Sequence, residues 1–267
     1  MTGNIYWHEP SMLQDGAVPS IIAIGDSWFW YPLPGGSLAT SLAKLVAPNQ
    51  HTLLVFGNNG AEAYDYVEGV YATMVDNALR RYGTTLSGVF VSGGGNDFAG
   101  FNDLRPLLGV NCGACASAEA CFNHGTSPGC VEELFDRVRR YYIELIDRVA
   151  AQIPAAARIF VHNYDYALPS GQAVIGQKAW LKPALVAANV PGGLRVACVR
   201  YLIDQFSTRL AGLAASYAGR VVFVDSRGTL AASDWANELH PKAAGFAKIA
   251  RQVWQPALAG AGLAQGA

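Results

Sequence analysis

The chain has 267 residues, 51% of them hydrophobic, so it can bury a substantial core. Its 19 basic and 20 acidic residues nearly cancel, and no block of Lys and Arg is present to neutralise a row of phosphates, so nucleic acid is not expected as a partner. No apolar run approaches the roughly 20 residues of a membrane-spanning helix. The opening MTGNIYWHEP lacks the pattern of a signal peptide, so a cytoplasmic location is the default expectation.

Apolar runs that alternate with amphipathic stretches predict alternating strands and helices. Strands are expected at 20–25, 53–56, 89–91, 158–161 and 221–224. Helices are expected from Ser37, a suitable N-cap, to 46, and at 63–78, 131–153, 196–213 and 246–253. Because parallel strands need crossovers and these are usually helices, the order predicts an α/β fold. We expect a flavodoxin-like three-layer α/β/α sandwich with a central, mostly parallel five-stranded sheet.

No linker or internal repeat divides the sequence, so we predict one domain over 1–267. Two segments do not belong to the regular alternation: a cysteine-rich insert at about 100–130, and a long irregular connection at 164–193 with three prolines and four glycines. Such connections often carry binding functions, and we expect both segments to roof a cleft. In sheets of this kind, ligands bind beyond the carboxyl ends of the strands.

Four of the five cysteines lie close together in the insert, and Cys198 stands apart in a helical pattern. Two disulfides would suit an even number of clustered cysteines, and a tetrahedral zinc site would also use four thiolates. We favour disulfides because the spacing does not match the paired knuckles of a zinc ribbon, and free thiols remain a third alternative. Disulfides would also agree with a secreted or periplasmic protein. The clustered residues are Cys112, Cys115, Cys121 and Cys130.

Small and polar residues follow three predicted strands. The first strand ends in Gly25-Asp26-Ser27, the second runs into GNNG at 57–60, and the third runs into GGGND at 93–97. The loop before the last helix holds His240. A serine becomes a nucleophile only when a base takes its proton, and folding could bring Ser27 and His240 together at the same edge of the sheet. The alternative is that Ser27 is only a helix N-cap.

An attacked acyl group also needs donors for the negative charge on its oxygen. Three groups could supply them: the backbone N–H groups of Ser27 and Gly60, and the side-chain amide of Asn96. Gly60 suits this role because it has no side chain to block the approach to its amide. Asp26 and Asp97 are expected to be structural. The other histidines are also expected to be structural or exposed, and His162, which has Asp165 nearby, is the one among them whose setting could indicate a further role.

Together, GDS after the first strand, NNG at 58–60, GGND at 94–97 and His240-Pro241 resemble the four sequence blocks of the SGNH hydrolases, also called GDSL esterases and lipases. The resemblance covers about 20–255. It implies that Ser27 is the nucleophile, that Gly60 and Asn96 are oxyanion-hole donors, and that His240 is the general base. It also implies an esterase that needs no cofactor.

Two positions depart from the family pattern. Trp28 replaces the usual leucine after the serine, and Asn237 stands where the family usually has an aspartate, three residues before the histidine. An amide oxygen can still accept the Nδ1–H bond and fix the imidazole tautomer. We therefore expect Asn237 to orient His240, with Asp234 as the charged alternative.

Four consecutive aromatic residues follow Ser27, from Trp28 to Tyr31. We expect at least one of Trp28, Phe29 and Trp30 to form an apolar wall of the substrate pocket. The predicted function is a serine esterase that hydrolyses a lipid, sugar or other small-molecule ester through an acyl-enzyme. The alternatives are an acyltransferase and a non-catalytic ligand-binding protein on the same scaffold.

Overall fold

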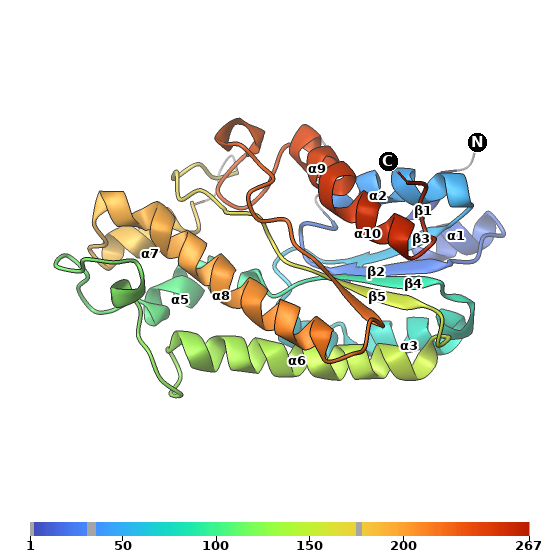
Figure 1. Cartoon of the computed structure of the whole chain (residues 1–267), viewed down its shortest axis with the longest axis horizontal. Helices are drawn as coiled ribbons and strands as arrows, with labels where there is room; N and C mark the ends of the chain where they lie inside the picture. The colour runs from blue at the N-terminus through green and yellow to red at the C-terminus, as the bar shows by residue number, and fades with distance from the viewer. Residues whose placement is uncertain (1–2, 31–35, 175–177, 267) are drawn as a thin grey trace.

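The computed structural model describes residues 3–30, 36–174 and 178–266, and its centre is a parallel sheet (Figure 1). Among these residues the sheet has six strands in the order β1-β3-β2-β4-β5-β6. The five predicted strands are present, all parallel, and the sheet has one strand more than expected. β1, which was not predicted, has two residues and joins the edge beside β3, too short for a periodic pattern. The strands are β1 Ile5–Tyr6, β2 Ile21–Gly25, β3 Leu53–Gly57, β4 Gly88–Ser92, β5 Arg158–His162 and β6 Val221–Val224.

Helices cover both faces of the sheet, which gives the expected three layers (Figure 1). One face carries α2 (Leu38–Val46), α9 (Ala243–Ile249) and α10 (Gln255–Gly260). The other face carries α3 (Ala72–Tyr82), α6 (Val131–Gln152) and α8 (Arg195–Ala215). The short helices are α1 (Glu9–Gln14), α4 (Asn96–Ala99), α5 (Phe101–Leu104) and α7 (Lys182–Ala187), and α5 and α7 lie with the insert at the left end of Figure 1.

The strand register aligns the ends of the three central strands. Gly25 at the end of β2 pairs with Gly57 of β3 on one side and with Ser92 of β4 on the other. Since the strands are parallel, the segments that follow them leave the sheet at one edge. The register therefore brings the three polar motifs together.

Three helix predictions need correction. The apolar stripe from Ala63 is not one helix: a 3-10 turn at Ala63–Tyr66 is followed by a tight bend, and α3 begins only at Ala72. Gly69 permits the bend, because a Cβ there would lie 2.6 Å from the Cα of Asp65. The connection 164–193 is not wholly irregular, since it contains α7. The last helix is divided by a π-helical turn at Ala250–Trp254 before α10, which has Pro256 in its first turn.

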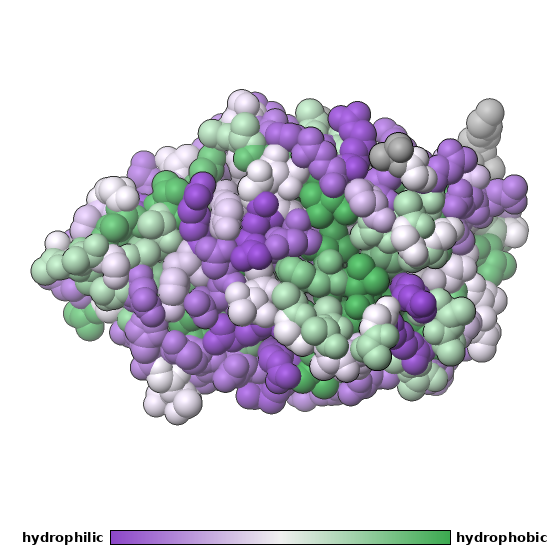
Figure 2. All heavy atoms as spheres, viewed as in Figure 1, coloured by the Kyte–Doolittle hydropathy of each residue, from purple (hydrophilic) through white to green (hydrophobic). Residues whose placement is uncertain are grey.

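Hydrophilic and weakly hydrophobic residues are interspersed over the face seen in Figure 2, and a hydrophobic patch lies to the right of its centre. Some apolar atoms are exposed on every folded protein, so this patch by itself indicates no partner. No helix in the described part of the chain is long and apolar enough to cross a membrane.

Candidate active site

Ser27 lies on a tight turn directly after β2. The backbone N–H of Asp26 continues the sheet by donating to the Ser92 carbonyl at 2.9 Å. The Asp26 carboxylate then accepts the N–H of Trp28 at 2.9 Å, which closes the turn around Ser27. Ser27 does not cap a helix, because α2 begins at Leu38 with Ser37 as its N-cap. The turn instead presents the Ser27 hydroxyl at the carboxyl edge of the sheet.

The structure brings His240 to Ser27 from a segment 213 positions away. The Nε2 atom of His240 lies 2.8 Å from Ser27 Oγ. On the other side of the ring, Nδ1 lies 3.1 Å from Oδ1 of Asn237. The indole N–H of Trp28 donates to the Leu239 carbonyl at 2.9 Å, which ties the serine turn to the histidine loop.

Asn237 also shapes the loop that carries the histidine. Its Oδ1 accepts the backbone N–H groups of Leu239 and His240, both at 2.9 Å. Asp234 is held elsewhere: its carboxylate accepts the N–H of Ala231 at 2.8 Å and lies 3.1 Å from Nζ of Lys248. The geometry therefore favours Asn237, rather than Asp234, as the residue that orients the imidazole.

Burial sets the charge state of His240. Loss of solvent lowers the pKa of its imidazole to about 4, because the cation is poorly solvated there. The ring is therefore neutral at neutral pH, with Nε2 facing the Ser27 hydroxyl. This is the protonation state that a general base requires.

The predicted oxyanion donors lie on neighbouring loops. Asn96 begins α4, and its Nδ2 donates to the Ala61 carbonyl at 2.9 Å. Gly60, just before Ala61, is exposed and has φ +75°, a backbone conformation that favours glycine. The bond between Asn96 and Ala61 links these two loops, and Asn96 lines the same cavity as Ser27.

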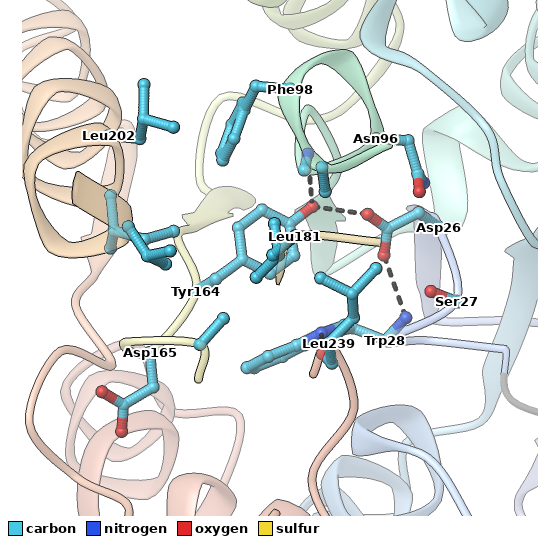
Figure 3. A pocket seen from close by; sticks show the side chains of 15 residues that line it. Asp26, Ser27, Trp28, Asn96, Phe98, Tyr164, Asp165, Leu181, Leu202 and Leu239 are labelled. Atoms are coloured by element: carbon cyan, nitrogen blue, oxygen red, sulfur yellow. Dashed lines mark hydrogen bonds between the residues drawn. The ribbon is translucent and has the colours of Figure 1, made fainter. Parts of the chain in front are cut away.

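That cavity opens beside Ser27 and has apolar walls (Figure 3). It is narrow, with a volume of about 40 Å³. Its polar groups are few: Asp26, Ser27 and Asn96 lie on one side, and Asp165 lies on the other. Such a combination of apolar walls and a few placed polar groups is typical of ligand sites. The apolar walls include Phe98, Leu181, Val199, Leu202 and Leu239.

The aromatic residues after Ser27 have different environments. Trp28 lines the cavity and packs edge-on against Tyr164, with ring centroids 5.0 Å apart. Phe29 does not line the cavity: it is fully buried in the core and packs against Trp254. Trp30 lies against Gly57 at a separate hollow. Successive side chains leave a tight turn in different directions, so among Trp28, Phe29 and Trp30 only Trp28 lines the cavity. Tyr31 lies outside the described residues.

Tyr164 supports the serine turn, and no pattern in the sequence indicated this role. Its hydroxyl donates to Oδ2 of Asp26 at 2.5 Å and accepts the N–H of Gly95 at 3.1 Å (Figure 3). Asp26 is buried, and loss of solvent raises the pKa of its carboxyl to about 6, although the hydrogen bonds from Tyr164 and from the Trp28 N–H oppose the rise. Tyr164 thus connects the segments that follow β2, β4 and β5.

Glu238 was also missed, because nothing in its sequence setting marks it. Its buried carboxylate accepts four backbone N–H groups, those of Gly171, Trp180, Leu181 and Lys182, at 2.7–3.1 Å. These donors belong to the long connection and to the start of α7, where a negative charge is favourable. Glu238 therefore anchors the connection to the histidine loop.

Two other polar groups have structural roles. His162 lies between the hydroxyls of Ser92 and Ser226, at 3.1 and 2.6 Å, and burial lowers its pKa to about 3. Asp97 accepts the N–H of Ala63 at 2.9 Å, and burial raises its pKa to about 7. Neither contacts the Ser27 hydroxyl in the described structure.

No model of a known protein family matches the sequence, and no curated protein matches it significantly. Solved structures do resemble it. A lipase from a goat rumen metagenome has a TM-score of 0.58 at 12% identity, covering 93% of this chain and 99% of its own. An extracellular lipase from Streptomyces rimosus has a TM-score of 0.51 at 18% identity, covering 91% and 100%.

A protein from Slackia heliotrinireducens, proposed to be an SGNH hydrolase, has a TM-score of 0.51 at 13% identity, covering 88% of this chain and 96% of its own. These likenesses extend over nearly the whole of each chain. The protein therefore has the fold of the SGNH hydrolases, as the four sequence motifs predicted.

Proposed function

We propose that the protein is a serine esterase that hydrolyses carboxylic esters through an acyl-enzyme. The observation that carries the proposal is the continuous contact from Ser27 Oγ to His240 Nε2, at 2.8 Å, and from His240 Nδ1 to Asn237, at 3.1 Å. This arrangement joins a nucleophile, a base and a group that orients the base. The lipases that share the fold support an ester as the substrate.

In the first half-reaction, neutral His240 takes the proton of Ser27 as Oγ attacks the ester carbonyl. The Ser27 and Gly60 N–H groups and the Asn96 amide are the proposed donors to the resulting oxyanion. Protonated His240 then gives its proton to the leaving alcohol, and the acyl group remains on Ser27. In the second half-reaction, His240 activates a water molecule that releases the acid.

Asn237 differs from a carboxylate in one respect that matters for this mechanism. Its amide oxygen accepts the Nδ1–H bond and so selects the tautomer with the Nε2 lone pair toward Ser27. It adds no full negative charge beside the imidazolium that forms during attack. The narrow apolar cavity beside Ser27 favours an ester with a slender apolar group.

Labelling with a fluorophosphonate tests the nucleophile directly. We expect one modified residue, Ser27, and no labelling of the Ser27→Ala variant, together with turnover of short p-nitrophenyl esters. An active protein with unlabelled Ser27 would refute the mechanism. Saturable ligand binding without labelling or turnover would favour a binding protein, and ester products formed with an added alcohol would indicate acyl transfer.

A matched pair of variants tests the orienting residue. Asn237→Ala removes the Nδ1 contact, and we expect kcat to fall by about 10²- to 10⁴-fold, the usual contribution of general base catalysis. Asp234→Ala removes only the contacts to Ala231 and Lys248 and is expected to keep most of the activity. The opposite result would assign the orienting role to Asp234.

A further inference from the structure

The cysteines of the insert form a cluster that the proposed catalysis does not use. The Sγ atoms of Cys112, Cys115 and Cys121 all lie within 4.8 Å of one another. The thiol of Cys198, on α8, lies 3.8 Å from the carbonyl oxygen of Ala118, in the same segment as Cys121. All five cysteines of the chain are free thiols in this structure.

This arrangement corrects the grouping expected from spacing alone. Cys130 precedes α6, its thiol faces Gly125, and no contact in the described part of the chain joins it to the three clustered thiols. Cys198, rather than Cys130, lies beside the cluster, because α8 packs against the insert. Its position 77 residues after Cys121 (198 minus 121) hid this relation from the sequence.

We propose that Cys112, Cys115, Cys121 and Cys198 bind one structural zinc ion. Zinc bonds to thiolate sulfur at about 2.3 Å, and a tetrahedral site with that bond length places the sulfurs about 3.8 Å apart. Three thiols that are mutually within 4.8 Å need only small side-chain movements to reach such a site. The Cys198 sulfur is not within 4.8 Å of all three, and in the proposed site a movement of its side chain from beside Ala118 supplies the fourth ligand.

The contacts among the thiols favour a common centre over two disulfides. A disulfide uses each sulfur once, at about 2.05 Å. Here three sulfurs, those of Cys112, Cys115 and Cys121, lie within 4.8 Å of one another, and three sulfurs cannot all be paired among themselves. The N–H of Cys115 donates to the Cys112 carbonyl at 2.9 Å, a turn that brings the first two sulfurs together.

The insert has little else to hold its shape. In the segment from 109 to 121, Cys112 and Cys121 are the buried residues, and the other side chains are exposed or half-buried. A segment with so small an apolar interior usually needs a cross-link or a metal. The interior of this segment therefore consists mainly of cysteine side chains.

Zinc binds cysteine as the thiolate, so each thiol that becomes a ligand releases one proton to solvent. The site would fasten the insert to α8, whose Val199 and Leu202 line the cavity beside Ser27.

The first test measures metal content in protein purified under reducing conditions without an affinity tag. We expect one zinc per chain and, after exchange with Co²⁺, the visible absorption bands of tetrahedral thiolate coordination. Cys198→Ser is expected to lose these bands, and the matched control Cys130→Ser to keep them. Loss in Cys130→Ser with retention in Cys198→Ser would overturn the ligand assignment, and zinc retained by a Cys112→Ser/Cys115→Ser variant would show an adventitious ion.

The second test needs no variant, so it decides the case even if Cys198→Ser does not fold. Native protein is alkylated and the modified cysteines are mapped by mass spectrometry, before and after a chelator is added. We expect rapid modification of Cys130 at first, and of the four ligand cysteines only after chelation. Metal-free protein with four reactive thiols, or with masses that show two disulfides, would overturn the proposal without bearing on Ser27.

Discussion

Replacing Asn237 with aspartate keeps the size of the side chain and places a negative charge beside the imidazole. The wild-type His240 has a pKa of about 4 because of burial, so its neutral form predominates above that pH. We expect kcat/KM of the wild type to stay high down to about pH 4 and then to fall tenfold per pH unit as His240 is protonated.

The size of the effect follows from the 3.1 Å between His240 Nδ1 and the Asn237 side-chain oxygen. An opposite charge at this range raises a pKa by about 1 to 3 units, which is about 1.4 to 4 kcal/mol in favour of the imidazolium. In Asn237→Asp we therefore expect the midpoint of the acid limb to lie between about pH 5 and about pH 7. The variant loses activity at a higher pH than the wild type.

The assay compares kcat/KM against pH for wild type and Asn237→Asp with a short p-nitrophenyl ester, while circular dichroism confirms that both remain folded. Asp26, with a pKa of about 6, titrates in both proteins, so the difference between the two profiles reports His240. A wild-type midpoint near the ordinary histidine value of about 6.5 would refute the role of burial. Identical profiles would refute the placement of residue 237 beside the base.

Three further substitutions test the supporting contacts. Glu238→Gln weakens the four backbone hydrogen bonds, and thermal and urea unfolding should show a loss of about 2 to 4 kcal/mol together with a lower kcat. Tyr164→Phe removes the 2.5 Å bond to Asp26, and steady-state kinetics should show a reduced kcat while circular dichroism stays native. The pKa of Asp97 is about 7 in the folded protein, so on a rise in pH the carboxyl ionises in the unfolded chain before it ionises in the folded one. The wild type should therefore lose stability, on the order of 4 kcal/mol, as the pH rises from about 4 to about 7. Asp97→Asn should lack this loss when urea unfolding is compared at low and neutral pH.

Much of the scaffold was readable from the sequence because its signals are local. Three signals depend only on residues within one segment: the apolar run at 21–25 indicates a buried strand, the apolar stripe of α6 indicates a helix, and Ser37 indicates where α2 begins. The alternation of strands and helices then predicted the sheet, since parallel strands require crossovers. Ser27 and His240 were also found, because a shared edge follows from the topology.

Other features depend on contacts between distant segments. The stripe from Ala63 indicated a longer helix, yet Gly69 allows the chain to bend before α3. Phe29 and Trp28 are adjacent aromatic residues, and only the path of the turn sends one to the core and the other to the cavity.

The order of the elements, and the sheet edge at which Ser27 and His240 meet, follow from patterns within the sequence. The tertiary structure alone placed Tyr164 against Asp26, Glu238 against the start of α7, and Cys198 beside the cysteines of the insert. Each of these contacts joins residues more than 50 positions apart. The periodic pattern of a segment does not indicate which distant residue it will contact. Helix and strand periods report which side of a segment is buried, whereas the packing of whole elements decides what it is buried against.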